Sequence, residues 1–472
     1  MPDIDERRIF DEAIRTDLLA FSLWAFSYLY PGSALRNNWH IGLIADYCER
    51  VMKGEVKRLV TCAPPRHLKS FITTICLPAF LLGRNPSEKI VCISYSQDLA
   101  ENFAHLCRKL MESQQYKRSF PQTRLDPKRS TKREIGTTKN GHRLATSVHG
   151  KLTGLGGEFL IIDDPMKADD AFSDTVREGV NTWFDSTLSS RLDNPKTGRI
   201  VVVAQRLHVD DLPGRLIERG GWEQLILPLV AYEDQSFEIG NVIMERGAGH
   251  ILHEEHFGEE EVAHLRATIP SSLFEAQWNQ RPVPSGGYLF KLAWLNHTEE
   301  VPEHFDLIVQ SWDTALMTNE TNDYTVCVTA GFRGKEIHII DVLRERLAFS
   351  EQVKRLPAHR KAFNADLVIV EGAHGGLALY DSVVKAHYPN LWLKHMNPKL
   401  SKLERAEWQT VKLEQGRVWL PRHAEWRTAF ERELMEFPKG KHDDQVDAFT
   451  QLLAAPDLAN LSQLAYAAKN AH

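Results

Sequence analysis

The sequence has no paired cysteines, no long apolar run and no excess of positive charge, and each absence excludes a class of protein. Its six cysteines all stand alone, without a CxxC pair to clamp zinc or exchange thiols, so they are expected in the core. No apolar run reaches the roughly 18 residues that a membrane-spanning helix needs. The first residues, MPDIDERRIF, are charged and unlike an export signal. We therefore expect a cytosolic protein without a membrane role.

The formal net charge of −6 argues against a protein that coats nucleic acid generally, because such affinity depends on basic groups that meet phosphates. Any contact with DNA would have to be local. The basic stretch from Lys117 to Arg133 is one candidate, although such clusters are often solvated loops. The 472 residues are 43% hydrophobic and 25% charged, which is ordinary for a globular chain of two domains.

In the first half, short apolar runs alternate with segments of helical periodicity. A helical preface is predicted over 3–30, helices over 39–52, 70–82 and 97–112, and strands over 58–62, 89–94, 159–162 and 198–204. Continuous apolar strands that alternate with helices are typical of a parallel sheet covered on both faces. The first half is therefore predicted to be an α/β domain with a mostly parallel sheet.

A second domain is predicted after the segment RPVPSGG at 281–287, which has the proline and glycine content of a linker. Strands are predicted over 306–312 and 367–370, a hairpin over 324–330 and 336–343, and a last helix over 443–453. The expected domains are 1–284 and 285–456, followed by a tail over 457–472. No internal repeat is found.

The segment APPRHLKS at 63–70 joins a predicted strand to a predicted helix. A loop in this position can hold phosphates, with Lys69 reaching the outer phosphates and the Ser70 hydroxyl binding magnesium. Ala63 and Leu68 replace both glycines of the general pattern GxxxxGK[ST]. A strand-turn-helix joint with an exposed lysine therefore explains the segment alone equally well.

A second acidic segment, EFLIIDDP at 158–165, strengthens the nucleotide hypothesis. A buried strand would deliver Asp163 and Asp164 to its carboxyl end, where open parallel sheets bind ligands. Asp163 is suited to hold magnesium, and Asp164 to orient the attacking water. The alternative is a turn or helix cap before Pro165.

The second half contains acidic residues at the ends of several predicted elements. Asp313 and Glu371 each follow a strand, and Asp443, Asp444 and Asp447 begin the last helix. Two-metal cleavage of a phosphodiester needs carboxylates from separate elements to converge in this way. Helical spacing places Asp443 and Asp447 on one face, so Asp443 is the first candidate ligand, Asp444 the substitute and Asp447 a support. Each residue taken singly could instead be a turn or cap residue.

Together these segments resemble the large subunits of bacteriophage terminases, whose phosphate loop commonly reads PPRHGKS and whose acidic strand commonly ends in DDP. The segments WDTA at 312–315, NDY at 322–324, VEG at 370–372 and HDDQVDA at 442–448 are similar to terminase nuclease motifs. The resemblance implies a P-loop packaging ATPase followed by an RNase H-like nuclease domain with a mixed sheet. Leu68 replaces the glycine of the family, and we expect it to hold its loop amide without positive φ.

The resemblance also implies roles for particular residues. ATP would be held by the loop residues Pro65, Arg66, His67, Leu68, Lys69 and Ser70. Arg66 would sense the γ-phosphate, and Trp39 with His40 would pack the adenine, although an aromatic residue in a helix is more often core.

Further implied roles concern coupling and metal. Gln205 and Arg206 would couple hydrolysis to movement. Ser70 and Asp163 would hold Mg²⁺ at the nucleotide. Asp313, Glu371, Asp443 and Asp444 would hold Mg²⁺, or alternatively Mn²⁺, at the nuclease site.

The implied activity is ATP-driven translocation of double-stranded viral DNA into a procapsid and metal-dependent endonucleolytic cleavage of concatemeric DNA in the cytoplasm of the bacterial host. The implied partners are double-stranded DNA, the portal protein, the terminase small subunit and further copies in a ring on the portal. Lys402, Arg405 and Lys412 are candidates for contact with the DNA backbone, with a solvated helix face as the alternative. Asp323 is a weaker candidate near the metals.

Two other functions fit parts of the pattern. A P-loop helicase or translocase could carry an inactive RNase H-like domain used only for binding, which predicts inert carboxylates. A structural head-assembly protein could retain a nucleotide-binding fold for docking, which predicts no turnover. The complete acidic set and the pairing of Lys69–Ser70 with Asp163–Asp164 argue against both.

Overall fold

The computed structural model describes residues 6–150, 156–240, 242–282, 289–314, 324–371, 374–385, 393–396, 400–440 and 442–455. The chain divides into two compact units, Met1–Leu265 with Ser272–Pro284 and Arg266–Ser271 with Ser285–His472. The predicted domain boundary at 284/285 and the predicted tail at 457–472 lie outside the described residues.

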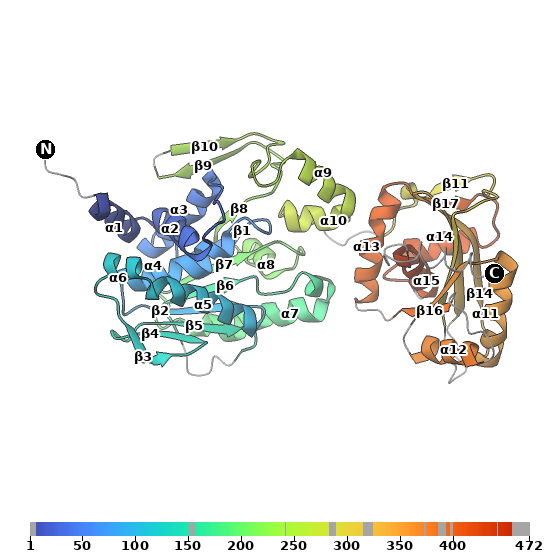
Figure 1. The fold of residues 1–472 in the computed structure, drawn as a ribbon, viewed down its shortest axis with the longest axis horizontal. Helices are drawn as coiled ribbons and strands as arrows, with labels where there is room; N and C mark the ends of the chain where they lie inside the picture. The colour runs from blue at the N-terminus through green and yellow to red at the C-terminus, as the bar shows by residue number, and fades with distance from the viewer. Residues whose placement is uncertain are drawn as a thin grey trace. The chain divides into compact units, whose positions relative to one another are not determined.

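The first unit is built on an eight-stranded sheet of order β3-β4-β5-β2-β6-β7-β1-β8 (Figure 1). The strands from β5 to β8 along this order are mutually parallel, and β3 and β4 form an antiparallel edge. The strands are β1 (Arg58–Cys62), β2 (Lys89–Ser94), β3 (Leu125–Ser130), β4 (Glu134–Thr137), β5 (His142–Ser147), β6 (Phe159–Asp163), β7 (Arg199–Ala204) and β8 (Glu223–Ile226).

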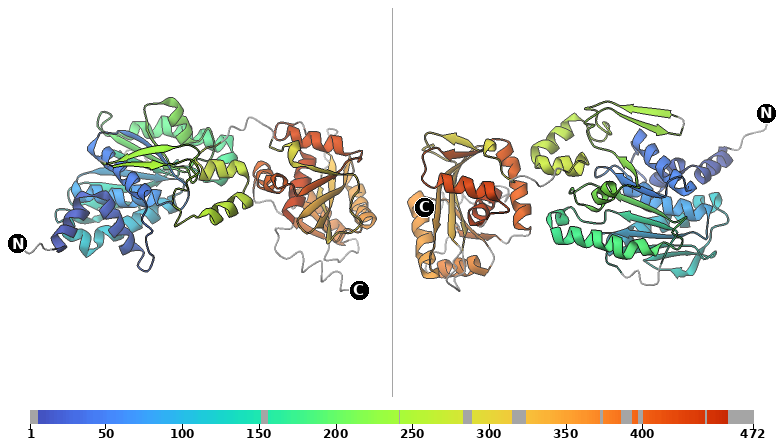
Figure 2. Two further views of the ribbon diagram at one scale, coloured as in Figure 1. Left: turned by 90° about the horizontal axis from the view of Figure 1, so that it is seen from above. Right: turned by 180° about the vertical axis from the view of Figure 1, so that it is seen from behind.

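Helices cover both faces of this sheet, and Figure 2 shows the layers from two further sides. One core is formed with the helices that precede and follow β1, and the other with α7 and α8. The helices are α1 (Glu6–Thr16), α2 (Leu18–Leu29), α3 (Trp39–Lys53), α4 (Leu77–Arg84), α5 (Gln97–Glu112), α6 (Gln114–Ser119), α7 (Asp174–Trp183) and α8 (Leu212–Arg219). The mostly parallel α/β architecture predicted for the first half is therefore confirmed.

The helix predicted over 70–82 is confirmed, but its first turns are π-helical. A π-helical segment, η1 (Phe71–Cys76), comes first, and α4 begins only at Leu77. Pro78 has no N–H with which to bond the Thr74 carbonyl one α-helical turn earlier, and that carbonyl instead accepts a hydrogen bond from Arg143 at 3.4 Å. The missing bond explains why the regular α-helical ladder starts late.

Strands β3 to β5 were not predicted from the sequence. Strand β3 reads LDPKRS, a charged segment with a proline, and its burial is partial. Such residues have low strand propensity, and proline is tolerated only where no ladder donor is needed, as at a sheet edge. This antiparallel edge includes part of the basic stretch 117–133.

The chain between the two sheets carries a β-ribbon and short helices. The ribbon consists of β9 (Gln235–Ile239) and β10 (Val242–Arg246), which pair in antiparallel fashion. The helices that follow are α9 (Glu259–Thr268) and α10 (Ser271–Leu273). Short 3-10 and π-helical segments also occur, η2 (Asp169–Phe172), η3 (Phe184–Leu188), η4 (Ser189–Arg191), η5 (Phe274–Trp278) and η6 (Leu292–Trp294).

The second unit contains a mixed seven-stranded sheet of order β11-β17-β14-β13-β12-β15-β16. Strand β13 is antiparallel to both β12 and β14, and β12, β15 and β16 are parallel. The strands are β11 (Asn296–Thr298), β12 (Leu307–Asp313), β13 (Thr325–Arg333), β14 (Glu336–Glu345), β15 (Leu367–Glu371), β16 (Leu393–Met396) and β17 (Val418–Pro421). The predicted hairpin and the mixed sheet are confirmed.

Helices lie on both faces of the second sheet, with α15 against β12 and β13 and with α12 against β15 and β16. The helices are α11 (Phe349–Phe363), α12 (His374–Lys385), α13 (Lys402–Glu414), α14 (Arg427–Glu436) and α15 (Asp444–Ala454). No helix within the described ranges has both the length and the apolar character needed to cross a membrane.

Candidate nucleotide and metal sites

The loop after β1 has backbone angles that glycine normally adopts. Both Arg66 (φ 64°) and Leu68 (φ 61°) lie in the left-handed region, so the expectation that Leu68 avoids positive φ was wrong. This conformation costs an L-residue about 1–2 kcal/mol. The Leu68 side chain packs against the core of the first unit, which offsets part of that cost. The loop therefore takes its tight turn without the glycines of the usual pattern.

Lys69 and Ser70 meet the acidic end of β6. The Lys69 Nζ lies 3.4 Å from Asp164 Oδ2, and Ser70 Oγ donates to Asp163 Oδ1 at 2.9 Å. Lys69 is buried, with 6% of its surface exposed. The four residues proposed from two distant segments therefore form one cluster at the carboxyl ends of β1 and β6, where parallel sheets bind ligands.

Asp163 lies in a setting that favours a cation. Complete burial, and after it the neighbouring charge of Asp164, raise its pKa to about 7, although Lys69 opposes the shift. Ser70 and Asp163 offer a hydroxyl and a carboxylate oxygen side by side, which are the hard oxygen ligands that Mg²⁺ prefers. The residues present therefore fit a magnesium ion.

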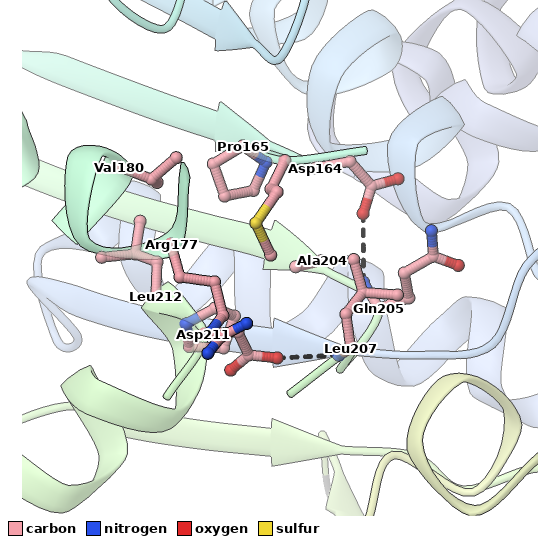
Figure 3. A pocket seen from close by; sticks show the side chains of 11 residues that line it. Asp164, Pro165, Arg177, Val180, Ala204, Gln205, Leu207, Asp211 and Leu212 are labelled. Atoms are coloured by element: carbon pink, nitrogen blue, oxygen red, sulfur yellow. Dashed lines mark hydrogen bonds between the residues drawn. The ribbon is translucent and has the colours of Figure 1, made fainter. Parts of the chain in front are cut away.

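Asp164 is held in place by the strand next to it. It has a positive φ of 41°, and its Oδ1 accepts a hydrogen bond from the Gln205 amide at 3.0 Å. Gln205 is in turn bonded by the Gln277 side-chain amide at 3.1 Å. Asp164 and Gln205 line the same pocket, together with Asp211 (Figure 3).

The segment after β7 forms a fixed turn around Asp211. Arg206 Nε donates to Asp211 Oδ1 at 2.9 Å, and the amides of Leu207 and Gly214 both donate to the same carboxylate at 2.8 Å. Arg206 is thus neutralised locally, whereas Gln205 contacts the acidic end of β6 through its backbone.

The side chains of the remaining loop residues point to different surroundings. Arg66 is exposed. The His67 ring is buried, its Nδ1 bonds the Pro65 carbonyl at 2.8 Å, and its exposure of 1% leaves it no access to solvent at the loop. The ring of His67 is therefore turned into the protein in this structure, and its part in holding a nucleotide stays a prediction.

His67 belongs to a histidine cluster with buried His40 and His253 and exposed His256, in which the ring centroids in contact lie 5.3–6.4 Å apart. Burial and the neighbouring rings lower the pKa of His40 to about 3 and, with burial the larger cause, that of His67 to about 4. Burial also lowers the pKa of His253 and of His256, so all four rings are mainly neutral near pH 7. This cluster was not predicted from the sequence, because its members come from three separate segments.

Trp39 lies beside the histidine cluster rather than in the 63–70 loop. Its ring stacks on Phe237 of β9, with centroids 5.4 Å apart and an interplanar angle of 29°. Trp39 and His253 both line an open pocket of about 280 Å³. His253 also contacts His67, so the cluster connects this pocket to the phosphate loop.

In the second unit, Asp313 and Glu371 lie next to each other. Trp312 pairs with Val370 across the parallel strands β12 and β15, and the two acidic residues that follow end their strands side by side. The final helix begins at Asp444, and the Asp443 side chain makes no capping hydrogen bond. The alternative role of Asp443 as a side-chain cap is therefore wrong.

Two cations from α13 occupy the space among these carboxylates. Lys402 Nζ lies 3.0 Å from Asp443 Oδ2 and 2.5 Å from Asp447 Oδ2. Arg405 lies 3.2 Å from Glu371 Oε1 and 3.3 Å from Asp447 Oδ1. Within the ranges that the structure describes, no three histidine, cysteine or acidic side chains are grouped closely enough to hold a metal ion as they stand.

The electrostatics indicate which carboxylates face one another. Burial raises the pKa of Asp313 well above its usual range, and Asp447, Glu371 and Asp444 raise it further. Burial also raises the pKa of Asp447 to about 6, against the influence of Lys402. Asp443 is absent from the causes at Asp313 and its side chain is 40% exposed. Asp447, ranked last from the sequence, thus acts more strongly on Asp313 than the first-ranked Asp443 does, and it shares Arg405 with Glu371.

Several carboxylates close together repel one another, and a bound cation relieves this repulsion. Carboxylate oxygens are ligands that suit Mg²⁺ and Mn²⁺. The donor set of this end of the second sheet therefore fits divalent metal. Asp323 lies outside the described residues.

The proposed DNA contacts have different surroundings. Lys402 and Arg405 lie at the acidic site. Lys412 is buried and donates to the Leu453 carbonyl at 2.7 Å, so its proposed contact with DNA was wrong. In the basic stretch of the first unit, several cations are paired with carboxylates, namely Arg118 with Asp11, Arg129 with Glu134 and Arg133 with Glu101.

Comparison with known proteins gives one family match. Residues 310–455 match the family model described as Terminase RNaseH-like domain. No curated protein matches the chain.

Among solved structures, the chain is similar to the large terminase from the thermophilic bacteriophage D6E, with 10% identity, a TM-score of 0.49, and coverage of 92% of this chain and 98% of that one. The large terminase of bacteriophage HK97 gives 12% identity, a TM-score of 0.36, and coverage of 92% and 99%. The large terminase nuclease from phage G20c with bound magnesium gives 18% identity, a TM-score of 0.28, and coverage of 36% and 98%. Residues 310–455, which lie in the second unit, are therefore similar to the terminase RNaseH-like domain.

Proposed function

We propose that the chain is the large subunit of a phage terminase, in which the first unit hydrolyses ATP to move double-stranded DNA and the second unit cuts that DNA. The observation that carries the proposal is the convergence of Asp313, Glu371 and Asp447 at one end of the sheet, inside the terminase RNaseH-like domain.

In the first unit, Lys69 would bind the outer phosphates of ATP and leave its ion pair with Asp164 to do so. Ser70 and Asp163 would hold Mg²⁺. Freed from Lys69 and still positioned by the Gln205 amide, Asp164 would orient the attacking water. Exposed Arg66 would neutralise charge on the γ-phosphate.

In the second unit, Asp313, Glu371 and Asp447 would hold divalent metal, with Asp444 next to them and Asp443 at the margin. Metal bound there activates water and stabilises charge on the cleaved phosphate. Lys402 and Arg405 occupy the same carboxylates in this structure, so they must give up these ion pairs. They would then be available to the phosphates of the DNA.

The partners follow from the proposed role. They are double-stranded DNA, a portal protein, a terminase small subunit and further copies of the chain in a ring on the portal, in the cytoplasm of the bacterial host.

The test uses the purified full chain with supercoiled plasmid, with Mg²⁺ or Mn²⁺, and separately with ATP and phosphate detection. We expect metal-dependent nicking or linearisation and ATP turnover. Lys69→Ala should abolish turnover and leave cutting intact, because the two sites lie in different units. Lys89→Ala is the matched control, since it removes a partly exposed lysine of the first unit that is paired with Asp193.

ATP turnover without cutting by the wild type would favour a helicase or translocase with an inactive RNase H-like domain. A wild type that shows neither ATP turnover nor cutting would favour a head-assembly protein. Loss of both activities in folded Lys69→Ala would contradict the separation of the two sites.

A further inference from the structure

A row of residues crosses the second sheet at the acidic site. Asp313 on β12 is the cross-strand partner of Val326 on β13, and Val326 is the partner of Arg344 on β14. Cross-strand partners present their side chains on the same face of a sheet. Arg344 therefore lies in line with Asp313, two strands away, on the face that α15 covers.

Two arginines stack on one aromatic ring at this edge of the row. The guanidinium of Arg344 lies 4.0 Å from the centroid of the Tyr324 ring, and that of Arg346 lies 4.7 Å from it. The edge of the His442 ring contacts Tyr324 at 5.5 Å, and His442 lies 4.0 Å from Asp444. This arrangement, which we call the Tyr324 stack, therefore adjoins the start of α15.

The two arginines differ in whether a carboxylate of the chain already pairs with the guanidinium group. Arg344 is paired with Glu433 at 3.4 Å. Arg346 is exposed, and among the described residues its guanidinium group contacts the ring of Tyr324. Stacking uses the flat face of a guanidinium and leaves its N–H groups, which lie in the plane, to bind phosphate oxygens in a fixed direction.

We propose that Arg346, positioned by Tyr324, binds a backbone phosphate of the DNA strand that the acidic site cuts. The proposal rests on the nuclease function proposed above. Strands lie about 4.8 Å apart, so the row positions of Asp313 and Arg344 are roughly 10 Å apart, and Arg346 follows Arg344 by two residues. The contacted phosphate therefore lies outside the carboxylate cluster, along the DNA strand from the cleaved phosphate.

A contact outside the carboxylate cluster holds the DNA strand independently of Lys402 and Arg405, which are paired with the carboxylates in this structure. A phosphate contact fixes the register of the DNA without reading its sequence. Arg346 is thus a positioning residue that fixes where the strand lies, and the carboxylates carry the chemistry.

The experiment measures binding of the full chain to a labelled 30-base-pair duplex by fluorescence anisotropy, in EDTA, at several salt concentrations. Each phosphate contact adds about 0.9 to the slope of log K against log salt, which is about eightfold in affinity at 0.1 M. Arg346→Ala should lose this amount of slope and affinity. In Mg²⁺, it should raise the KM for DNA by a similar factor and leave kcat and ATP turnover within about twofold.

Two variants separate this role from general charge and from folding. Arg333→Ala removes an exposed arginine at the opposite end of β13, where it pairs with Glu336, and should bind DNA like the wild type. Arg346→Lys keeps the charge without the planar stacking and should recover most of the slope but less of the affinity.

A wild-type chain that binds and cuts DNA, while Arg346→Ala keeps its slope and KM, overturns this assignment alone. Equal losses in Arg333→Ala and Arg346→Ala also overturn it, because they indicate a general effect of charge. A wild-type chain that neither binds nor cuts DNA overturns the proposed nuclease, and this assignment with it.

Discussion

The ammonium group of Lys402 lies 2.5 Å from Oδ2 of Asp447, so a side-chain cation occupies a carboxylate of the proposed metal site. Asp447 is 4% exposed, and a buried carboxylate is costly without a partner. The same carboxylate cannot fully serve the ammonium and a divalent ion together. Metal binding at this site is therefore a competition with α13.

Replacing Lys402 by Ala should raise the affinity of the site for Mn²⁺ by about tenfold, equivalent to about 1.4 kcal/mol, and should lower the melting temperature in EDTA. Calorimetric titration with Mn²⁺ and thermal melts measure both effects. The control is Lys335→Ala, at an exposed position in the β13–β14 turn of the same unit. Unchanged Mn²⁺ affinity in Lys402→Ala would show that the ion pair does not compete with metal.

Replacing Asp313, Glu371 or Asp447 by Asn or Gln should each reduce plasmid cutting by at least about a hundredfold and spare ATP turnover, because they hold the same metal ions. Double variants should lose little more than single ones, as expected for residues that act as a unit. Asp443→Asn should lose less, about tenfold, since Asp443 is half-exposed and lies at the margin. Cutting rates and melts on the same proteins provide the measurement. Wild-type cutting by Asp447→Asn, or a larger loss in Asp443→Asn, would reverse the order given by the structure.

The stability of variants at position 68 should follow how well each residue tolerates a positive φ. At ordinary backbone angles, Ala stabilises a protein over Gly by about 0.4–1 kcal/mol. At φ 61°, we expect the reverse, with Leu68→Gly more stable than Leu68→Ala by about 1 kcal/mol, because only glycine is unstrained there. Urea unfolding of the two variants compares them directly, with the lost side-chain packing nearly equal in both. A more stable Ala variant would mean that the loop relaxes out of the left-handed conformation.

The histidine cluster should make the first unit sensitive to acid. Burial lowers the pKa of His40 to about 3, whereas an unfolded histidine titrates near 6.5. Below about pH 6.5 the unfolded chain therefore binds a proton that the folded chain does not, and stability is lost as the pH falls from there toward 3. The slope is about 1.4 kcal/mol per pH unit for each such histidine.

His40→Gln should remove about 1.4 kcal/mol per pH unit from the dependence of unfolding free energy between about pH 6 and pH 4.5. Urea unfolding across this range measures the slope. His105→Gln, at an exposed position on α5 of the same unit, is the control. An unchanged slope in His40→Gln would mean that His40 is protonated in the folded chain.

The sequence by itself determined most of the regular structure around both sites. The helix predicted over 97–112 matches α5, and the strands predicted over 58–62 and 89–94 match β1 and β2. Continuous apolar runs leave a buried parallel strand as the main interpretation, and the carboxyl ends of such strands meet at one edge. For this reason Asp163, Asp313 and Glu371 could be named as strand-end residues before their surroundings were known.

Only the tertiary structure decided how those residues are used. Local periodicity cannot report that Lys402 reaches Asp447, that Lys412 is buried, or that Arg346 stacks beside the acidic row, because each contact joins segments far apart in the chain. The positive φ of Leu68 is likewise imposed from outside the loop, by the need to join β1 to the next helix while its side chain packs on the core. A residue pattern records what a side chain can do chemically, but the folded backbone determines which partners compete for it.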